Sequence, residues 1–488
     1  MKLKIKLLDW SAGVPVVMLN PKTAEKLGIH VKDRITLSVG AKKLSSIVDT
    51  IKKIVKPNEI AVSSEAKEIM NLKNRQKIKI ELTPPPRTLV YIKKKLNGER
   101  LTKKEIRLII QDIVTNSLSE PEIALFISAM YEKGMEFNEI IYLIESILET
   151  GNKLKLKNKL IVDKHSIGGV AGRVSPLVIS ICSSTGLTMP KTSSRAITSP
   201  AGTADAMECL AKVDFSIEEI KKIISKTNAC IVWGGGLGMV PADSKIIKIE
   251  KLLKIDPKSQ LLASIMSKKL AVGSNHIIIH IPYGKSAKVN KTKALELEKD
   301  FKKIAKHFNI KLVCVLTKNN GPLGNGIGPF LEMIDVLKVL KREDSCHNLE
   351  KIAIEISGVI LELTKKAKKG KGEELALEIL NSGKAFEKFK AIIEAQQGKI
   401  VDLKPAKFLK TIYSSKNCKI KEIDNKKINF LARITGCPNE KSSGLYLHSH
   451  EGDNLKNKQK IITIYSRSKT RLRHAVEYYK KEKPIIFG

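Results

Sequence analysis

Short apolar segments alternate with longer, helix-patterned segments between residue 159 and about residue 400. The apolar segments fall at residues 160–162, 229–233, 276–281 and 311–317. Strands that alternate with helices in this way are typical of an α/β domain with a largely parallel sheet. Ligands of such domains bind in the loops at the carboxyl ends of the strands. Functional side chains are therefore expected in those loops.

The first 83 residues form a β-rich domain by their pattern of alternating apolar and polar residues. The expected strands are residues 2–7, 16–19, 34–39 and 77–82. A short helix follows the second strand, with Asn20 as its N-cap and Pro21 in its first turn. The stiff run of prolines at 84–86 then marks a domain boundary.

Helical periodicity begins after these prolines and predicts a helical domain over residues 87–158, with a later segment near 240–270. Thr102 with Glu105, and Ser119 with Glu122, form capping boxes that open amphipathic runs. The α/β domain then spans 159–400, and 401–488 form a C-terminal α+β lobe. The predicted fold class is α/β: a small helical domain plus a large α/β domain, with an N-terminal β-rich domain and a C-terminal β-rich lobe.

The chain carries 88 Lys and Arg against 50 Asp and Glu, a formal net charge of +38. A nucleic-acid-binding protein concentrates such residues in an arm or stripe with aromatic side chains. Here the lysines occur along the whole chain, so a solvated surface is the preferred interpretation and nucleic-acid binding is the alternative from another functional class. No apolar run approaches the about 20 residues of a membrane helix, so no membrane association is expected.

The seven cysteines are scattered, without a C-x-x-C pair. An odd and unpatterned set indicates reduced thiols and a cytoplasmic protein. It also argues against a zinc site, and we expect neither a metal nor a cofactor.

The first functional motif is Asp163-Lys164-His165-Ser166-Ile167-Gly168-Gly169, expected directly after the strand at 160–162. Paired glycines let backbone N–H groups approach an anion, while Lys and Ser add a positive charge and a hydroxyl donor. This chemistry suits phosphate. A Walker loop is excluded because its G-x-x-x-x-G-K-[ST] spacing is absent. A purely structural strand-end loop is the competing interpretation.

The second motif is the segment 192–208, TSSRAITSPAGTADAME. It gathers six hydroxyl residues, Arg195 and Gly202 between residues 192 and 203, and then enters a helix. An arginine among hydroxyl groups suits recognition of an oxyanion. The structural alternative is a polar loop with helix caps.

Together the motifs resemble the thymidine/pyrimidine-nucleoside phosphorylase family, which has a K-H-S-x-G-G loop and, further on, S-x-R, G-T-x-D and Glu. Here these are residues 164–169, 193–195, 202–205 and Glu208. The resemblance runs from about Leu101 to the C-terminus and implies substrates in a cleft between the helical and α/β domains. The phosphate contacts that it implies are Lys164, Ser166, Ser175, Ser193 and Thr203.

Departures from that family narrow the substrate. Ile249 stands where pyrimidine enzymes carry the Arg that binds a pyrimidine carbonyl. Residues 198–203 replace the usual H-T-G-G-T, and residues 284–288 add cations where nucleoside enzymes have apolar residues. Added hydroxyls and cations are what a 5′-phosphate requires. With its N-terminal extension, which is expected to serve subunit association, the chain resembles the archaeal branch that acts on nucleoside monophosphates.

That branch implies a pentosyltransferase of nucleotide catabolism: AMP and inorganic phosphate give adenine and ribose 1,5-bisphosphate, with CMP and UMP as further substrates. It also implies a homodimer or a higher homo-oligomer. The 5′-phosphate is assigned to Lys288, together with Arg195. The full set of implied nucleotide contacts is Gly168, Ser194, Arg195, Ala196, Ile197, Thr198, Ser199, Thr203, Ser264 and Lys288.

Departure of the base requires a proton, and two residues compete to donate it. A carboxyl group such as Asp256 can hold a proton in a cleft that disfavours its charge, whereas histidines such as His165 have a more convenient intrinsic pKa. The resemblance favours Asp256 as the catalytic residue. Two enzyme alternatives are a pyrimidine-nucleoside phosphorylase, against which Ile249 argues, and anthranilate phosphoribosyltransferase-like chemistry, for which no suitably spaced acidic pair is evident.

Overall fold

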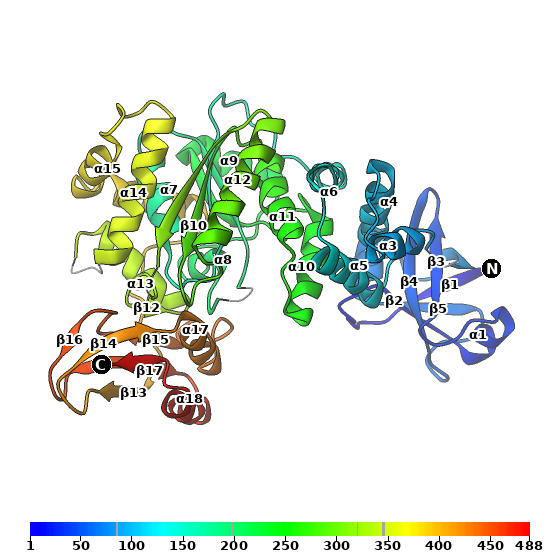
Figure 1. The fold of residues 1–488 in the computed structure, drawn as a ribbon. Coiled ribbons are helices and arrows are strands. Elements are labelled where there is room, and N and C mark those ends of the chain that lie inside the picture. Colours follow the sequence, from blue (N-terminus) through cyan, green and yellow to red (C-terminus); the bar gives the residue numbers. More distant parts are fainter. Residues whose placement is uncertain (84–85, 197–198, 320, 344–346) are drawn as a thin grey trace. The chain divides into compact units, whose positions relative to one another are not determined.

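The computed structural model describes residues 1–83, 86–196, 199–319, 321–343 and 347–488. Contacts between residues divide the chain into two units (Figure 1). The first unit contains Met1–Thr150 and Pro241–Ala263, and the second contains Gly151–Val240 and Ser264–Gly488. The finer division into four domains remains a prediction.

A closed barrel of six strands begins the first unit, in the spatial order β1-β5-β2-β4-β3-β6. Its strands are β1 Lys2–Leu7, β2 Val16–Leu19, β3 Arg34–Val39, β4 Lys42–Thr50, β5 Glu59–Val62 and β6 Lys77–Leu82. The four strands expected from the sequence are all present with the expected bounds. The pattern missed β4 and β5, and in β4 the hydroxyls of Ser45 and Ser46 lie buried where apolar residues would reveal a strand. The β-rich N-terminal domain is confirmed.

Two short helices accompany the barrel, α1 Pro21–Leu27 and α2 Ser64–Met70. The Asn20 side chain accepts a hydrogen bond from the Lys22 N–H at 3.1 Å, which confirms the predicted N-cap. Arg34 of β3 forms a 2.7 Å ion pair with Glu122 of the following helical region. This half-buried contact joins the barrel to that region within one unit.

Helices make up the rest of the first unit: α3 Leu89–Leu96, α4 Lys103–Val114, α5 Glu120–Lys133, α6 Phe137–Glu149 and α10 Pro241–Leu253. Both predicted capping boxes are present at the starts of α4 and α5. Lys245 of α10 donates to the carbonyl oxygens of Ile113 and Val114 at 2.9 and 2.6 Å, and so caps the end of α4. Helix α10 thus packs with α4, although about 130 residues separate them in the sequence.

The parallel strands of the second unit fall into two groups. One has the order β11-β10-β7 and the other pairs β8 with β9. These strands are β7 Val162–Ser166, β8 Met189–Ser193, β9 Ala229–Trp233, β10 His276–Tyr283 and β11 Lys311–Lys318. A single parallel bridge, Ile161 to Thr188, aligns the two sheets. The largely parallel strand arrangement expected from the sequence is therefore confirmed.

The strand predicted at residues 160–162 lies further along the chain, because β7 begins at Val162 and continues to Ser166. Asp163 and Lys164, expected in a loop, lie inside the strand and are almost completely buried. Charged side chains are typical of a loop, but here each has a buried polar partner: Lys269 for Asp163, 106 residues away, and Ser175 for Lys164, 11 residues away.

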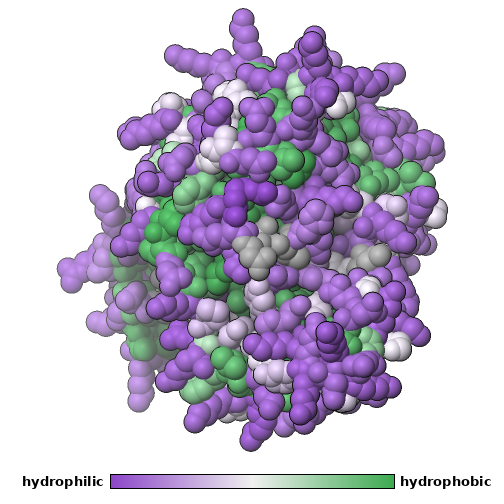
Figure 2. All heavy atoms as spheres, turned by 90° about the vertical axis from the view of Figure 1, so that its left-hand side faces the viewer, coloured by the Kyte–Doolittle hydropathy of each residue, from purple (hydrophilic) through white to green (hydrophobic). Residues whose placement is uncertain are grey.

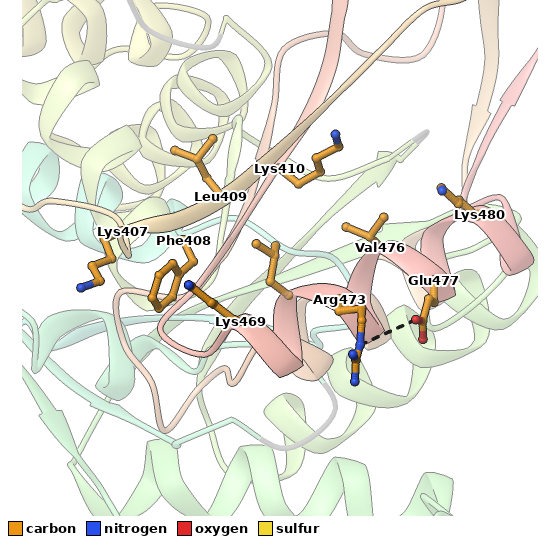
Figure 3. Close-up of a pocket in the computed structure, with 10 residues that line it drawn as sticks. Lys407, Phe408, Leu409, Lys410, Lys469, Arg473, Val476, Glu477 and Lys480 are labelled. Atoms are coloured by element: carbon orange, nitrogen blue, oxygen red, sulfur yellow. Dashed lines mark ion pairs between the residues drawn. The ribbon is translucent and has the colours of Figure 1, made fainter.

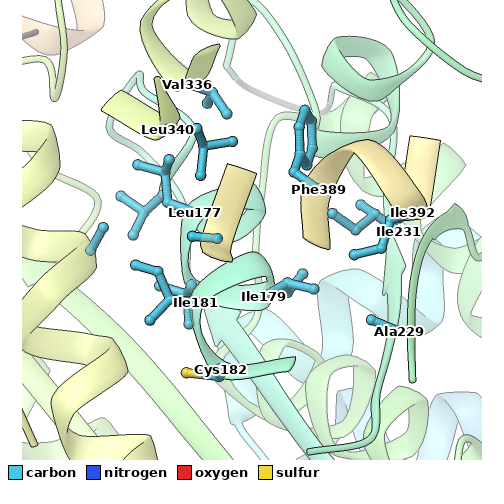
Figure 4. Close-up of a cluster of buried hydrophobic side chains, with 14 of the residues drawn as sticks. Leu177, Ile179, Ile181, Cys182, Ala229, Ile231, Val336, Leu340, Phe389 and Ile392 are labelled. Carbon is cyan, nitrogen blue, oxygen red and sulfur yellow. The ribbon is translucent and has the colours of Figure 1, made fainter. Parts of the chain in front are cut away.

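Eight further helices of the described chain surround these strands. They are α7 Val174–Ser183, α8 Thr203–Met207, α9 Ile217–Thr227, α12 Lys291–His307, α13 Pro329–Leu340, α14 His347–Leu363, α15 Gly372–Asn381 and α16 Lys384–Ala395, while α11 Lys258–Ala271 crosses the unit boundary. Ile181 of α7, Ile231 of β9 and Phe389 of α16 meet in one apolar core (Figure 4). This core holds the strands that carry the candidate site.

The C-terminal lobe consists of two further sheets, ordered β12-β15-β17-β13 and β16-β14-β18. Its elements are β12 Gly326–Ile327, β13 Phe408–Tyr413, β14 Cys418–Ile423, α17 Asn425–Ile434, β15 Gly444–Leu447, β16 Asn454–Leu455, β17 Lys460–Ser466, α18 Lys469–Glu482 and β18 Ile485–Phe487. The β-rich character expected of this lobe is confirmed.

Hydrophilic side chains dominate the face drawn in Figure 2, with smaller apolar areas between them. Within the described ranges, no helix is long and apolar enough to cross a membrane. The six cysteines that the structure describes are free thiols. Of the His, Cys, Asp and Glu residues described, no three come together in a group that could hold a metal ion.

Replacing Phe389 by Ala should lower the free energy of unfolding by about 3–5 kcal/mol, because it leaves a cavity in a fully buried core. Urea unfolding followed by circular dichroism measures this loss. Lys390→Ala, at an exposed position of the same helix, is the control and should change stability by less than about 0.5 kcal/mol. Equal effects of the two substitutions would contradict the packing described for α16.

Candidate functional site

The carboxyl ends of the parallel strands meet at one edge in the second unit. Strand β7 pairs in parallel with β10, with Ser166 opposite His280, and β8 pairs in parallel with β9. The Val162 N–H donates to the Thr188 carbonyl at 2.9 Å, which places β7 beside β8. The segments that follow β7, β8 and β10 therefore leave from the same edge. These segments carry the two sequence motifs and the added cations of 284–288.

Lys164 lies in the middle of β7 and is 1% exposed. Its Nζ donates to the Ser175 hydroxyl at 3.2 Å. Burial, with Arg173 and Lys269 nearby, lowers the pKa of Lys164 to about 7. Ser166 is two residues along the strand and so lies on the same face as Lys164. Three of the residues predicted to contact phosphate thus gather on one side of β7.

The paired glycines of the first motif allow a close approach of two loops. Gly168 and Gly169 have φ values of +84° and +91°, which L-residues with side chains rarely adopt. A Cβ atom on Gly169 would lie 2.7 Å from the Lys288 Cβ and 2.9 Å from the Lys288 nitrogen. The structure thereby brings Lys288 against the glycine loop, although 119 residues separate them in the sequence (288 − 169).

Asp163 points to the opposite face of β7 and forms a buried ionic junction. Its Oδ2 lies 2.7 Å from Lys269 Nζ of α11, and its Oδ1 lies 3.6 Å from Lys191 Nζ of β8. All three side chains are almost completely excluded from solvent. A carboxylate between two ammonium groups joins β7 to β8 and to the end of α11, and this tie holds the loops at the carboxyl edge in register.

The two candidate proton donors lie in different surroundings. Burial and the positive charges of four lysines lower the pKa of His165 well below its usual range. His165 is therefore the neutral imidazole near pH 7, which is a much weaker proton donor than the imidazolium. Asp256 is exposed in the loop between α10 and α11, within the first unit.

Asp205 closes the loop of the second motif. Its Oδ2 accepts hydrogen bonds from the Ala196 and Gly202 N–H groups, each at 2.7 Å. A Cβ atom on Gly202 would lie only 2.4 Å from the Ser194 carbonyl oxygen, so the two ends of the loop touch. A buried carboxylate that accepts two backbone N–H groups holds Ala196 and Gly202 together without any ligand.

Arg195 is engaged by the protein itself. Both guanidinium NH2 groups bind Glu208 at 2.8 Å, one of them reaches Asp205 at 3.4 Å, and the group lies 5.0 Å from the Trp233 ring centroid. The Arg195 hydrogen bond also lowers the pKa of Glu208 to about 2. This arrangement makes Arg195 part of the loop framework, and the structure lends no support to its expected role at the 5′-phosphate.

Several of the other predicted residues have hydroxyl groups, and three of these hydroxyls bind the protein itself. The hydroxyls of Ser193 and Ser199 donate to the carbonyls of Val232 and Ala201 at 3.0 and 2.7 Å. Thr203 opens α8 at the end of the second motif, while Ile197 and Thr198 lie outside the described residues. Ser264 on α11 accepts a hydrogen bond from Lys268 at 2.7 Å.

A surface pocket of about 620 Å³ lies elsewhere, between β13 and α18 of the C-terminal lobe (Figure 3). Its lining combines basic residues with Phe408 and Leu409. None of the predicted site residues lines it, so this pocket is separate from the candidate site. The candidate site is therefore placed by the carboxyl ends of β7, β8 and β10, and not by the position of this pocket.

Comparison with known proteins gives the family. Residues 90–151 match the model of the glycosyl transferase family helical bundle domain, and residues 158–386 match that of the a/b domain of the same family. The AMP phosphorylase of Methanococcoides burtonii is 38% identical over 100% of this chain and 97% of its own. That of Pyrococcus furiosus is 39% identical over 99% and 97%. The chain belongs to the AMP phosphorylase family.

The fold extends beyond this family. Anthranilate phosphoribosyltransferase from Thermus thermophilus aligns with a TM-score of 0.54 at 17% identity. The alignment covers 63% of this chain and 99% of that protein. At this identity the likeness shows a common fold and nothing about the reaction. This chain thus shares its fold, over the aligned part, with an enzyme of another name.

Sequence reasoning missed several residues that build the site in this member of the AMP phosphorylase family. Asp205 was recognised only as part of a motif, and Lys191 and Lys269 were given no role. Arg173 was also missed: it pairs with buried Glu332 and donates to the Ala201 carbonyl at 2.6 Å. The available signal was a charged residue in an otherwise apolar segment, which indicates a buried partner.

Asp205→Ala should loosen the loop formed by the second motif. The substitution leaves two N–H groups without their acceptor, at a cost of about 1–3 kcal/mol. Hydrogen–deuterium exchange in peptides covering 194–204 should become roughly 5- to 150-fold faster. Glu218→Ala, which removes an exposed helix carboxylate, is the control and should leave those peptides unchanged. Unchanged exchange in the Asp205 variant would show that the loop is held by other contacts.

Proposed function

We propose that this protein cleaves AMP with inorganic phosphate, giving adenine and ribose 1,5-bisphosphate, and acts in the same way on CMP and UMP. The observation that carries the proposal is the meeting of three segments at one strand edge, which hold the two motifs and the cations of 284–288. The chain is also 38–39% identical to AMP phosphorylases over its length. The same proposal makes it a pentosyltransferase of nucleotide catabolism that works without a cofactor.

Inorganic phosphate would bind at the start of the glycine loop, held by Lys164, Ser166 and Ser193, with Ser175 and Thr203 beside them. The Lys164–Ser175 hydrogen bond and the burial of Lys164 support this assignment. The phosphate must attack the anomeric carbon of a ribose that develops oxocarbenium character as the base departs. Holding it in place can supply about 7–11 kcal/mol in favourable cases, so the main task of these residues is positioning.

The nucleotide would lie along the glycine loop and the second motif. Gly168, Ser194, Ala196 and Ser199 offer backbone and hydroxyl groups at the strand edge, with Ser264 from α11 as a further contact. The contact between Gly169 and Lys288 supports Lys288 as the ligand of the 5′-phosphate. Ile249 is buried in α10 and has no polar group for a pyrimidine carbonyl, which favours an adenine nucleotide over the specificity of a pyrimidine-nucleoside enzyme.

Asp256 would donate the proton to the departing base. The neutral state of His165 near pH 7 favours Asp256 over His165, and general acid catalysis typically contributes about 10²–10⁴-fold. An exposed carboxylate needs a less polar surrounding to hold a proton, so the assignment requires that bound substrate cover Asp256.

The assembly and location of the protein are part of the same proposal. We infer a homodimer or a higher homo-oligomer, association through the N-terminal barrel, and a cytoplasmic location that suits its free thiols. The spread of lysines favours a solvated surface over a nucleic-acid site. RNA or DNA that bound in a salt-dependent manner, with no phosphate-dependent release of adenine from AMP, would favour the alternative.

Lys288→Ala should lower kcat/KM for AMP roughly 10- to 150-fold, because a charge-assisted hydrogen bond to the 5′-phosphate is worth about 1.5–3 kcal/mol. Phosphorolysis of adenosine, which lacks that group, should change much less. Release of adenine from each substrate measures both values. Lys291→Ala, an exposed lysine three residues further along, is the control. Equal losses for AMP and adenosine would refute the assignment.

Asp256→Asn should lower kcat for AMP by about 10²–10⁴-fold with a smaller change in KM, since an amide cannot donate the required proton. Steady-state kinetics over a range of AMP concentrations separates the two constants. Near-normal turnover in this variant, together with complete loss in His165→Ala, would assign the proton to His165 instead.

A further inference from the structure

The surroundings of the first motif contain more buried amines than carboxylates. Lys164, Lys191 and Lys269 are 1%, 5% and 0% exposed, and the carboxylate of Asp163 lies among them. Asp163 is occupied by Lys269 and Lys191, at 2.7 and 3.6 Å. Buried ions normally have a partner, because an uncompensated charge in a low-dielectric interior costs several kcal/mol. Three amines beside one carboxylate therefore require an explanation.

Lys164 is the amine without a carboxylate of its own. Its Nζ binds the neutral hydroxyl of Ser175, and within the described part of the chain no carboxylate oxygen lies within 4.0 Å of it. Since strand residues alternate between faces, Asp163 projects from the other side of β7. The Asp163 carboxylate thus stabilises the other two lysines more than Lys164.

The groups packed around Lys164 add positive or neutral character. Arg173, from the segment before α7, is paired with Glu332 of α13. His280 of β10 binds Thr317 of β11 at 2.8 Å, and burial lowers the pKa of His280 to about 3, so this imidazole is neutral. Lys269, from α11, is paired with Asp163, and burial lowers its pKa. His165, the next residue of the strand, is half-buried and neutral near pH 7.

We propose that phosphate enters this site together with one proton, which passes from solvent to the Lys164 Nζ. In the empty site above pH 7, Lys164 is largely a neutral amine that shares a hydrogen bond with Ser175. When a phosphate oxygen arrives, the nitrogen lone pair takes up a proton, and the ammonium that forms becomes the counter-ion of the anion. No bond of the phosphate changes in this step. The inference rests on the phosphate site of the proposed function.

The direction of the coupling follows from the charges. The pKa of Lys164 is lowered to about 7 when no anion is present, and an adjacent anion raises it. Above pH 7 the free site has lost the proton and the occupied site keeps it, so binding takes up a proton. Below about pH 6 the amine is protonated in both states and uptake disappears. Anion affinity should consequently fall as pH rises above 7, by up to about tenfold per pH unit for one proton.

Isothermal titration calorimetry of the full-length protein tests the coupling. Sulfate is the first probe, because it does not titrate in this range and any proton taken up belongs to the protein; inorganic phosphate is the second. Measurements in two buffers of different ionisation enthalpy give the number of protons. At pH 8 we expect an uptake approaching one proton per chain, falling toward zero at pH 5.5. Binding of both anions with no uptake at pH 8 would overturn the inference and leave the proposed function intact.

The variant Lys164→Arg identifies the group. Arginine keeps the positive charge but does not titrate below pH 12, so sulfate should bind with no proton uptake and with a flat pH dependence. Uptake that persists in this variant would place the proton elsewhere, with Lys269 as the candidate, and would overturn the assignment to Lys164. If neither anion bound the wild-type protein, the phosphate site and the inference would both fall. Should the larger side chain prevent folding, the wild-type uptake still decides whether binding and protonation are coupled.

Discussion

The buried contact of Asp163 with Lys269 and Lys191 is the interaction on which the candidate site depends. Asp163 and Lys269 are 106 positions apart, so their contact joins β7 to the last turn of α11. Lys191 extends this contact to the neighbouring strand β8. The sheets at this point have only three and two strands, and a single bridge connects them. Backbone hydrogen bonds alone would therefore leave β7 and β8 weakly aligned. The ionic junction supplies the missing alignment directly below the loops that carry the motifs.

The protein uses its own carboxylates to shape the loops for an anion. Asp205 binds two N–H groups of the second motif, Glu208 holds Arg195, and Glu332 holds Arg173, which in turn binds the Ala201 carbonyl. Each of these contacts fixes backbone before a substrate arrives. Preorganisation of this kind lowers the ordering cost of binding. It also explains why an arginine in a functional motif need not touch the substrate.

The sequence was informative about the fold wherever burial follows local periodicity. Strands β1, β3 and β6 of the barrel were predicted with their observed bounds, because apolar and polar residues alternate along them. Strand β8 was not expected, since Lys191, Thr192 and Ser193 are polar although Lys191 and Thr192 are buried. The bounds of β7 were wrong for the same reason. A buried lysine is stable only through a partner elsewhere in the chain, and no local pattern encodes that partner.

The candidate site was predictable in part. Motifs and resemblance indicated the residues around Lys164 and the second loop, because these types of side chain suit an oxyanion. The proximity of Lys288 to Gly169 was implied only through the family, and geometry now supports it. The framework contacts of Asp205 and Arg195 were not anticipated, because composition cannot tell whether an arginine faces a ligand or a neighbouring carboxylate.

Net charge and local charge act differently in this molecule. The formal charge of +38 comes mostly from exposed lysines, and salt screens such charges beyond about 8–10 Å. They raise the concentration of anions near the surface without choosing among them. Lys164 and its buried neighbours are screened far less, and their protonation responds to what occupies the site. Discrimination between anionic ligands must therefore arise in the few lysines that the fold removes from water, rather than in the many that it leaves exposed.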